Sequence, residues 1–196
     1  MLDGYKIIKS INTKDDFLRA LEPYGTLIYQ KDDVNNLGAV EISTRLGINK
    51  YAYKKLGLFP HTDRSSELVP PRYVAIWYEK MADYGGEPII FLANKVFSND
   101  NLENFKAYFT SENDQLANLY SFYDQDSNFF RFRNDDHIYL SASTIAKFER
   151  VVQLIKDNQV TLNLESKDCL IIDNWNIFHG RTAFTGERII HRALIQ

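Results

Sequence analysis

Two side chains that commonly bind metal ions stand two positions apart in the stretch FPHTDRS, residues 59–65. On an extended chain, residues i and i+2 point to the same side, so the imidazole of His61 and the carboxylate of Asp63 can be directed at one ion. A His-x-Asp pair is nevertheless a weak motif, because it also arises by chance in loops. A third ligand is needed before the pair indicates a metal centre.

The third ligand is sought among the remaining histidines, His137, His179 and His191. His179 is the best candidate, because it follows the apolar run LIIDNWNIF and precedes Gly180, which suits a bend at the rim of a sheet. Two histidines and one carboxylate form the facial triad of non-haem Fe(II) sites, which leaves three positions of the ion open. We expect His137, in a predicted loop, and His191 not to be ligands.

Three arginines lie within the fourteen residues HGRTAFTGERIIHR near the C-terminus. Arg188 and Arg192 are four positions apart, so on a strand they share one face and His191 lies on the other. Their apolar neighbours indicate a segment that is at least half buried, and buried guanidinium groups require anionic partners. A bound dicarboxylic acid would supply such a partner. Surface arginines on an edge strand are the alternative.

The elements that must position these residues are expected to form a single domain over residues 1–196. The chain is 44% hydrophobic, and it shows no repeat, low-complexity tract or linker.

Its net charge of −3 gives no basic field for nucleic acid or an anionic membrane. No apolar run reaches the length of a bilayer, and MLDGYKIIKS lacks the core of a signal peptide, so we expect a cytoplasmic protein. The single cysteine, Cys169, is expected to be buried and structural.

Hydrophobic spacing predicts helices and strands in an order typical of a β-sandwich or barrel with helical additions. Helices are expected over residues 13–21, 35–47 and 143–158, the first capped by Thr13 and the last by Ser143. Strands are expected over residues 25–30, 72–80, 87–93, 159–165, 168–174 and 187–195, with a turn at Gly85-Gly86 that joins two neighbouring strands. Two weaker helices, 101–109 and 114–123, fall in a segment, about 98–140, that is a candidate lid or insertion.

The order PHTD, GGEPIIF, LIIDNWNIFHGR and then two arginines spaced by four resembles the Fe(II)/2-oxoglutarate-dependent dioxygenases of the TauD/TfdA branch, which includes the clavaminate synthase-like amino-acid hydroxylases. The resemblance runs from Phe59 to the C-terminus and is most specific in residues 59–93 and 168–192. It implies a mainly β protein with flanking helices, folded as a double-stranded β-helix, which is a jelly roll of the cupin type. It further implies the ligand and co-substrate residues that follow: His61, Asp63 and His179 bind Fe(II), Arg188 grips the distal carboxylate of 2-oxoglutarate, and Arg192 lies close to the co-substrate or holds an acidic group of the substrate.

The resemblance also implies a reaction that consumes O₂ and 2-oxoglutarate, releases succinate and CO₂, and hydroxylates or desaturates an unactivated C–H bond. A carboxylate at Asp63 favours this outcome over halogenation, since related halogenases have a small residue there. Pro88 stands where many relatives have a threonine whose hydroxyl helps to hold 2-oxoglutarate. The chain is also shorter than most relatives, so we expect a more open site or one completed by a second subunit in a homo-oligomer.

Mixed charges near the predicted site suit a small zwitterion, such as a free or modified amino acid of a natural-product pathway. Solvated loop charges are the alternative for each candidate substrate residue, namely Arg64, Ser65, Arg72, Arg133 and Asp135. The alternative function is a catalytically degenerate jelly-roll module that binds a small carboxylate or a protein partner. Pro88 and the short chain favour that module, whereas three ligands together with Arg188 favour the enzyme. The lack of a basic stripe argues against a nucleic-acid partner.

Overall fold

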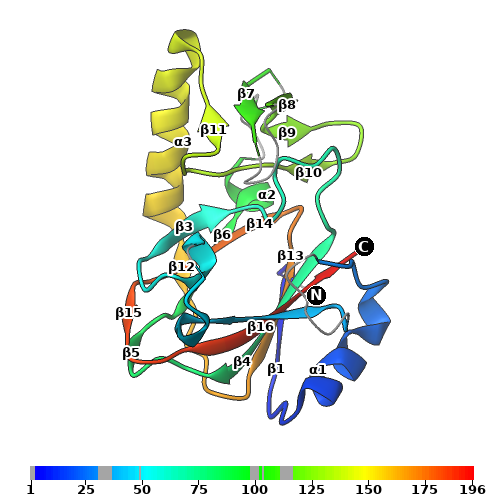
Figure 1. Ribbon diagram of the computed structural model, residues 1–196. Helices are drawn as coiled ribbons and strands as arrows, with labels where there is room; N and C mark the ends of the chain where they lie inside the picture. The colour runs from blue at the N-terminus through cyan, green and yellow to red at the C-terminus, as the bar shows by residue number, and fades with distance from the viewer. Residues whose placement is uncertain (1–2, 31–36, 49, 98–101, 103, 111–116) are drawn as a thin grey trace.

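Two antiparallel β-sheets face each other in the computed structural model, which describes residues 3–30, 37–48, 50–97, 102, 104–110 and 117–196 (Figure 1). The five-stranded sheet has the order β1 (Tyr5–Ile8), β13 (Cys169–Asp173), β4 (Tyr73–Lys80), β16 (Ile189–Ile195) and β2 (Ala39–Ser43). The four-stranded sheet has the order β12 (Val160–Thr161), β6 (Pro88–Leu92), β14 (Ile177–Arg181) and β3 (Leu58–His61). The predicted jelly roll, mainly β with flanking helices, is confirmed. None of the helices in these described ranges is long and apolar enough to cross a membrane.

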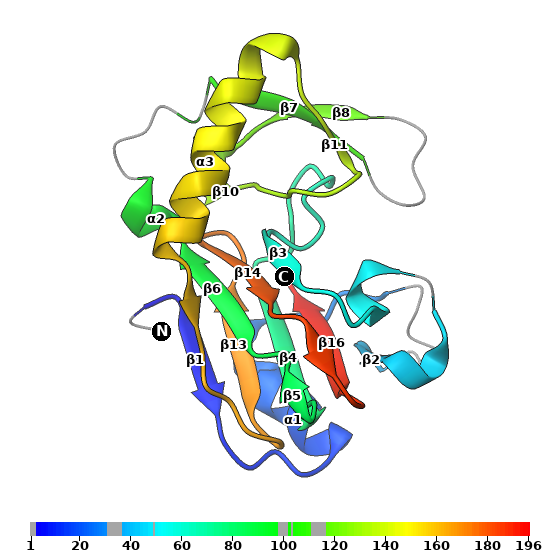
Figure 2. The same ribbon diagram turned by 90° about the vertical axis from the view of Figure 1, so that its left-hand side faces the viewer.

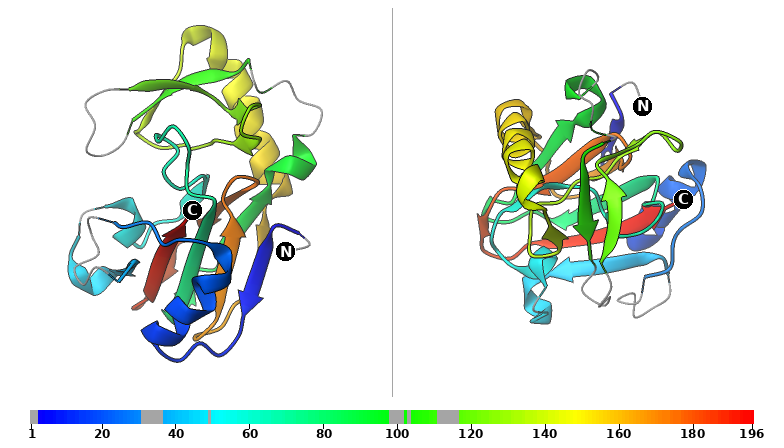
Figure 3. Two further views of the ribbon diagram at one scale, coloured as in Figure 1. Left: turned by 90° about the vertical axis from the view of Figure 1, so that its right-hand side faces the viewer. Right: turned by 90° about the horizontal axis from the view of Figure 1, so that it is seen from above.

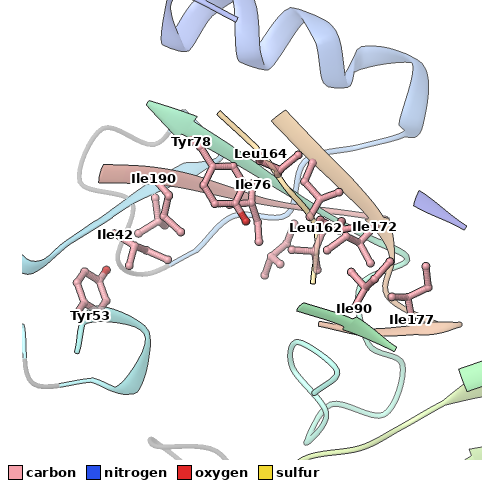
Figure 4. Packing of buried hydrophobic residues seen from close by; sticks show 14 residues of the cluster. Ile42, Tyr53, Ile76, Tyr78, Ile90, Leu162, Leu164, Ile172, Ile177 and Ile190 are labelled. Atoms are coloured by element: carbon pink, nitrogen blue, oxygen red, sulfur yellow. The ribbon is translucent and has the colours of Figure 1, made fainter. Parts of the chain in front are cut away.

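Strand β4 shows how the period-2 pattern divides the core. Val74, Ile76 and Tyr78 point into the space between the sheets, where they pack with Ile90 and other apolar residues of the opposite sheet (Figure 4). Trp77, on the other face of β4, packs against helix α1 (Lys14–Leu21), which covers the outer face of the five-stranded sheet (Figure 3). Helix α1 begins where predicted, because the Thr13 hydroxyl accepts a hydrogen bond from the Asp16 amide at 3.0 Å.

A second lobe stands above the two sheets (Figures 1 and 2). It contains a three-stranded sheet of order β11 (Ile138–Tyr139), β7 (Lys106–Phe109) and β8 (Asn118–Ser121), and a small ladder of β9 (Tyr123–Asp124) with β10 (Phe129–Phe130). Helix α3 (Ile145–Asn158) packs on this lobe through a cluster rich in phenylalanine, and the short helix α2 (Ala93–Val96) adjoins the same cluster. A lid or insertion over residues 98–140 stays a prediction.

The remaining elements are short. Strands β5 (Tyr84–Gly85) and β15 (Phe184–Thr185) pair with each other beside the sandwich. Among the residues that the structure describes, four 3₁₀ turns are also present, and they cover Glu22–Tyr24, Thr44–Leu46, Tyr51–Tyr53 and Ala142–Thr144.

Three predicted helices are wrong, because strands form within their described parts. Within the range 35–47, residues Ala39–Ser43 form β2, which pairs with β16 and buries Val40 and Ile42 between the sheets. Within 101–109 and 114–123, the chain forms β7, β8 and the start of β9, while residues 101, 103 and 114–116 lie outside the described residues. In β7, buried Ala107 and Phe109 alternate with exposed neighbours, which is a period of 2 rather than 3.6.

Other boundaries also differ from the predictions. Strands β4 and β6 are not neighbours, because the chain leaves one sheet and enters the other between them, and β5 pairs instead with β15. The predicted strand 25–30 is reduced to an isolated bridge between Leu27 and Ile195, and 159–165 keeps only the two residues of β12. Helix α3 starts after Thr144 without a side-chain cap, so the expected Ser143 cap is wrong.

Candidate active site

Two residues of the predicted triad, His61 and His179, lie on neighbouring strands directly opposite each other. His61 ends β3 and pairs in the ladder with His179 in the middle of β14, and their ring centroids are 4.8 Å apart. Asp63 follows two residues after His61, and its carboxylate lies 3.4 Å from His61 Nε2 and 4.0 Å from His179 Nε2. The three candidate ligand atoms thus lie within 4.8 Å of one another.

Gly180 permits the close approach of the two strands that carry these histidines. A Cβ atom at this position would collide with the backbone of Leu58 and Pro60 on β3. The ladder also shifts register between His179 and Arg181, so β14 is irregular at the site. The glycine is therefore required for contact between strands, rather than for the bend that its position suggested.

The protonation states of the three side chains suit a divalent metal. His61 Nδ1 lies 3.0 Å from the carbonyl oxygen of Phe59, so this nitrogen carries the proton and Nε2 is left as a ligand. Burial lowers the pKa of His179 to about 3, so its imidazole is neutral at neutral pH. Burial alone would raise the pKa of Asp63, but the nearby Arg192 guanidinium holds that pKa well below its usual range. Two imidazoles and one carboxylate form a ligand set that fits Fe(II).

Asn174, which sequence reasoning did not single out, fixes the backbone of Asp63. Its side chain is fully buried, and its Oδ1 accepts a hydrogen bond from the Asp63 amide at 2.9 Å. Its Nδ2 donates to the carbonyl oxygens of Asp63, at 3.2 Å, and of Pro71, at 2.9 Å. Because Asn174 lies in the turn between β13 and β14, it links the segment of one candidate ligand to the turn that leads to His179.

Replacing Asn174 by alanine is expected to weaken Fe(II) binding by about tenfold to a hundredfold, the usual effect of losing a residue that orients a ligand. The free energy of unfolding is expected to fall by about 1–3 kcal/mol, since buried backbone groups of Asp63 and Pro71 lose their partners. Anaerobic Fe(II) titration and thermal unfolding measure the two effects.

Asn174→Asp should weaken Fe(II) binding at least as much, because it directs a carboxylate oxygen at the carbonyl oxygens of Asp63 and Pro71. Asn176→Ala is the matched control, since the Asn176 amide donates to the Asp173 carboxylate at 2.9 Å in the same turn. If Asn174→Ala bound Fe(II) as tightly as the Asn176→Ala control, Asn174 would have no positioning role.

Arg192 contacts the carboxylate of the candidate ligand Asp63, a contact that was not predicted from the sequence. Its Nη1 lies 3.3 Å from Asp63 Oδ2, and its Nη2 donates to Gln30 Oε1 at 3.1 Å. Gln30 Nε2 in turn donates to the Arg192 carbonyl at 3.3 Å, so one buried side chain holds both ends of the arginine. The sequence carries no motif for Gln30, because the contact depends on the path of residues 25–30 along β16.

The three candidate ligands open onto a cavity of about 620 Å³ that lies between the sheets and extends toward the second lobe. Arg188 lines it and is 4% exposed, and its Cζ lies 5.4 Å from the ring centre of Tyr78 and 5.7 Å from that of Phe184. Within the described part of the chain, no carboxylate lies within ion-pair distance of Arg188, and its Nε has no hydrogen-bond partner. Burial in this setting disfavours the charged guanidinium and lowers the pKa of Arg188.

A second buried cation lies near Arg188. Arg181 also lines the cavity and stacks on the same Phe184 ring at 5.0 Å. Its guanidinium donates to backbone carbonyls of Lys54 and Leu56, so it anchors residues 52–56. Burial and the nearby Arg188 charge lower the pKa of Arg181 to about 10. This end of the cavity therefore has excess positive charge and suits an anion.

Four of the five candidate substrate residues line the cavity, namely Arg64, Ser65, Arg133 and Asp135. Arg133 and Asp135 form a bidentate ion pair with both contacts at 2.7 Å. Arg72 lies elsewhere, where it forms an ion pair with Asp173 and covers the ring of Trp175.

The two histidines that were not expected to be ligands differ in position. His137 lines the cavity but is not among the three clustered ligand residues. His191 points to the outer face of the sheet, where it stacks on Trp77 and contacts Glu79 at 2.7 Å. Its position agrees with the strand alternation that separates it from Arg188 and Arg192.

Residues 103–194 match the model of the taurine catabolism dioxygenase TauD, TfdA family. The resemblance to the TauD/TfdA family is confirmed. A trimethyllysine dioxygenase from Meyerozyma guilliermondii is 42% identical over 52 residues, a match that spans 24% of this chain and only 13% of that enzyme.

Solved structures of non-haem iron oxygenases share the fold of this chain. OrfP, in complex with Fe and alpha-ketoglutaric acid, matches with a TM-score of 0.77 at 15% identity, covering 98% of this chain and 75% of OrfP. An asparagine oxygenase in complex with Fe(II), 2S,3S-3-hydroxyasparagine and succinate matches with a TM-score of 0.77 at 13% identity, covering 98% of this chain and 74% of the oxygenase. At these identities the likeness establishes the jelly-roll fold.

Proposed function

We propose that this protein is an Fe(II)- and 2-oxoglutarate-dependent oxygenase that hydroxylates a free or modified amino acid. One observation carries the proposal: three candidate metal ligands lie within 4.8 Å of one another in the cavity that also holds Arg188, a buried cation with no carboxylate partner in the described residues. The first feature suits Fe(II), and the second suits the distal carboxylate of 2-oxoglutarate.

The residues of the chain then have distinct tasks. His61, Asp63 and His179 hold Fe(II), Arg188 binds the far end of 2-oxoglutarate, and the apolar walls exclude water. Fe(II) and 2-oxoglutarate, when bound, would supply the chemistry that lets O₂ act as the oxidant: one oxygen atom of O₂ would go into succinate as 2-oxoglutarate loses CO₂, and the other would go to an unactivated C–H bond of the substrate. Arg192 neutralises the Asp63 carboxylate and presents a guanidinium to the cavity for an acidic group of the substrate.

An amino acid is the substrate class that the cavity supports best. Both signs of charge line its walls, since the Arg64–Glu67 and Arg133–Asp135 pairs lie beside the candidate ligands. OrfP has been solved with (3S)-hydroxy-L-Arg, and the asparagine oxygenase has been solved with hydroxyasparagine. A homo-oligomer, a cytoplasmic location and a natural-product pathway stay predictions.

The test is a turnover assay with Fe(II), 2-oxoglutarate, O₂ and each proteinogenic L-amino acid, free or N-methylated, read out by succinate formation and by the mass of the product. The proposal predicts succinate in a one-to-one ratio with a product that is heavier by one oxygen atom for at least one amino acid. If 2-oxoglutarate binds but no amino acid, free or N-methylated, raises succinate release above background, the degenerate binding module is the better account.

A further inference from the structure

Pro88 leaves the co-substrate without the hydroxyl that many TauD/TfdA relatives place after the Gly-Gly-acid turn. In the structure Pro88 pairs with Arg181 in the four-stranded sheet and is not among the residues that line the cavity. Thr182 is close in space, but its hydroxyl accepts the amides of Gly86 and Glu87 and donates to the Glu87 carboxylate. Neither Pro88 nor Thr182 is therefore placed to offer a hydroxyl donor beside Arg188.

Tyr78 is the residue that the fold places there. It lies on β4 opposite Ile190 of β16, two residues beyond Arg188 along the neighbouring strand. Its side chain is 1% exposed and lines the cavity, and its hydroxyl points into the space between the sheets (Figure 4). The Arg188 guanidinium lies 5.4 Å from the centre of its ring.

The surroundings of Tyr78 keep its hydroxyl protonated, so that it can donate a hydrogen bond. Burial raises the pKa of Tyr78 to about 12 against the opposing effect of Arg188, so the phenol stays protonated at neutral pH. A neutral O–H group beside a buried guanidinium completes a site for a carboxylate without adding a further cation, next to Arg181 and Arg188.

We propose that the Tyr78 hydroxyl donates a hydrogen bond to the distal carboxylate of 2-oxoglutarate beside Arg188, in place of the threonine that Pro88 replaces. This inference rests on the proposed function, because it takes 2-oxoglutarate as the anion that occupies the basic end of the cavity. It assigns Tyr78 as a co-substrate-binding residue of this chain.

Tyr78→Phe is expected to weaken 2-oxoglutarate binding to the Fe(II)-loaded protein by roughly tenfold or more, as follows from loss of a hydrogen bond to a charged group. Binding is measured anaerobically through the charge-transfer band of the Fe(II) chelate. Binding of 2-oxovalerate, which has a methyl group in place of the distal carboxylate, should be unchanged. Tyr53→Phe is the matched control, since Tyr53 also lines the cavity but its hydroxyl donates to the Glu41 carbonyl at 3.3 Å.

An Arg188→Met background separates a direct contact from an effect transmitted through Arg188. A direct contact predicts that Tyr78→Phe still weakens 2-oxoglutarate binding in this background. The proposal is overturned if the effect disappears there, or if Tyr78→Phe binds 2-oxoglutarate as tightly as the wild type while unfolding at the same temperature. Failure of the wild type itself to bind 2-oxoglutarate would instead overturn the proposed function.

Discussion

Replacing His179 by alanine is expected to reduce Fe(II) affinity by at least about a hundredfold, more than the loss of a residue that only orients a ligand. His179 presents a neutral imidazole on a rigid central strand, opposite His61 and next to Asp63. With this ligand removed, the remaining imidazole and carboxylate would hold the ion at only two positions. Anaerobic titration with Fe(II), in competition with a chromogenic chelator, measures the loss.

His137→Ala is the matched control for this experiment. His137 lines the same cavity but is outside the cluster formed by His61, Asp63 and His179. We expect it to bind Fe(II) as the wild type does. Equal losses in His137→Ala and His179→Ala would point to a general disturbance of the cavity, and unchanged binding in His179→Ala would contradict the assigned ligand set.

Arg188→Met is expected to raise the dissociation constant of 2-oxoglutarate by about thirtyfold to a thousandfold or more. Truncating one partner of a buried charge pair costs about 2–5 kcal/mol, because the other charge is left without compensation. Fe(II) binding should be retained, since Arg188 packs on Tyr78 and Phe184, whereas the arginine that pairs with Asp63 is Arg192. Titration of the Fe(II)-loaded variant with 2-oxoglutarate under nitrogen measures the change.

Arg188→Met is not expected to destabilise the fold of the protein without co-substrate, although it weakens 2-oxoglutarate binding. A buried guanidinium with no carboxylate nearby is costly, so Arg188→Met should leave the unfolding temperature unchanged or raise it. Arg72→Met is the control, because Arg72 pairs with Asp173 outside the cavity, and its loss should leave 2-oxoglutarate binding intact. Weak 2-oxoglutarate binding in Arg72→Met as well would argue against a specific role for Arg188.

The parts of the site that follow from local spacing were predictable. The i, i+2 rule placed the His61 and Asp63 side chains together, and the spacing of four placed Arg188 and Arg192 on one face away from His191. The apolar run before His179 and the glycine after it made this residue the best third ligand, although no local pattern could connect it to residues 59–65. The pairing of His61 with His179 joins segments more than a hundred residues apart, so it depends on the sheet topology.

The missed features depend on contacts that are distant in sequence. Gln30 acquires its position only when residues 25–30 run along β16, and Asn174 only when its turn meets the segment of Asp63. A helix was predicted where β2 forms, because the conformation of this short segment is determined by pairing with β16 rather than by intrinsic propensity. In the second lobe, aromatic residues close together in sequence suggested helical faces, whereas alternation along β7 was the correct signal.

The central claim is that His61, Asp63 and His179 hold Fe(II) in a site that also receives 2-oxoglutarate. Its most direct test is anaerobic addition of Fe(II) and then 2-oxoglutarate to the apo-protein, followed by visible absorption spectroscopy. The account predicts a metal-to-ligand charge-transfer band that saturates at one equivalent of Fe(II) and is absent in His179→Ala. A wild-type protein that binds no Fe(II) and gives no band would contradict it.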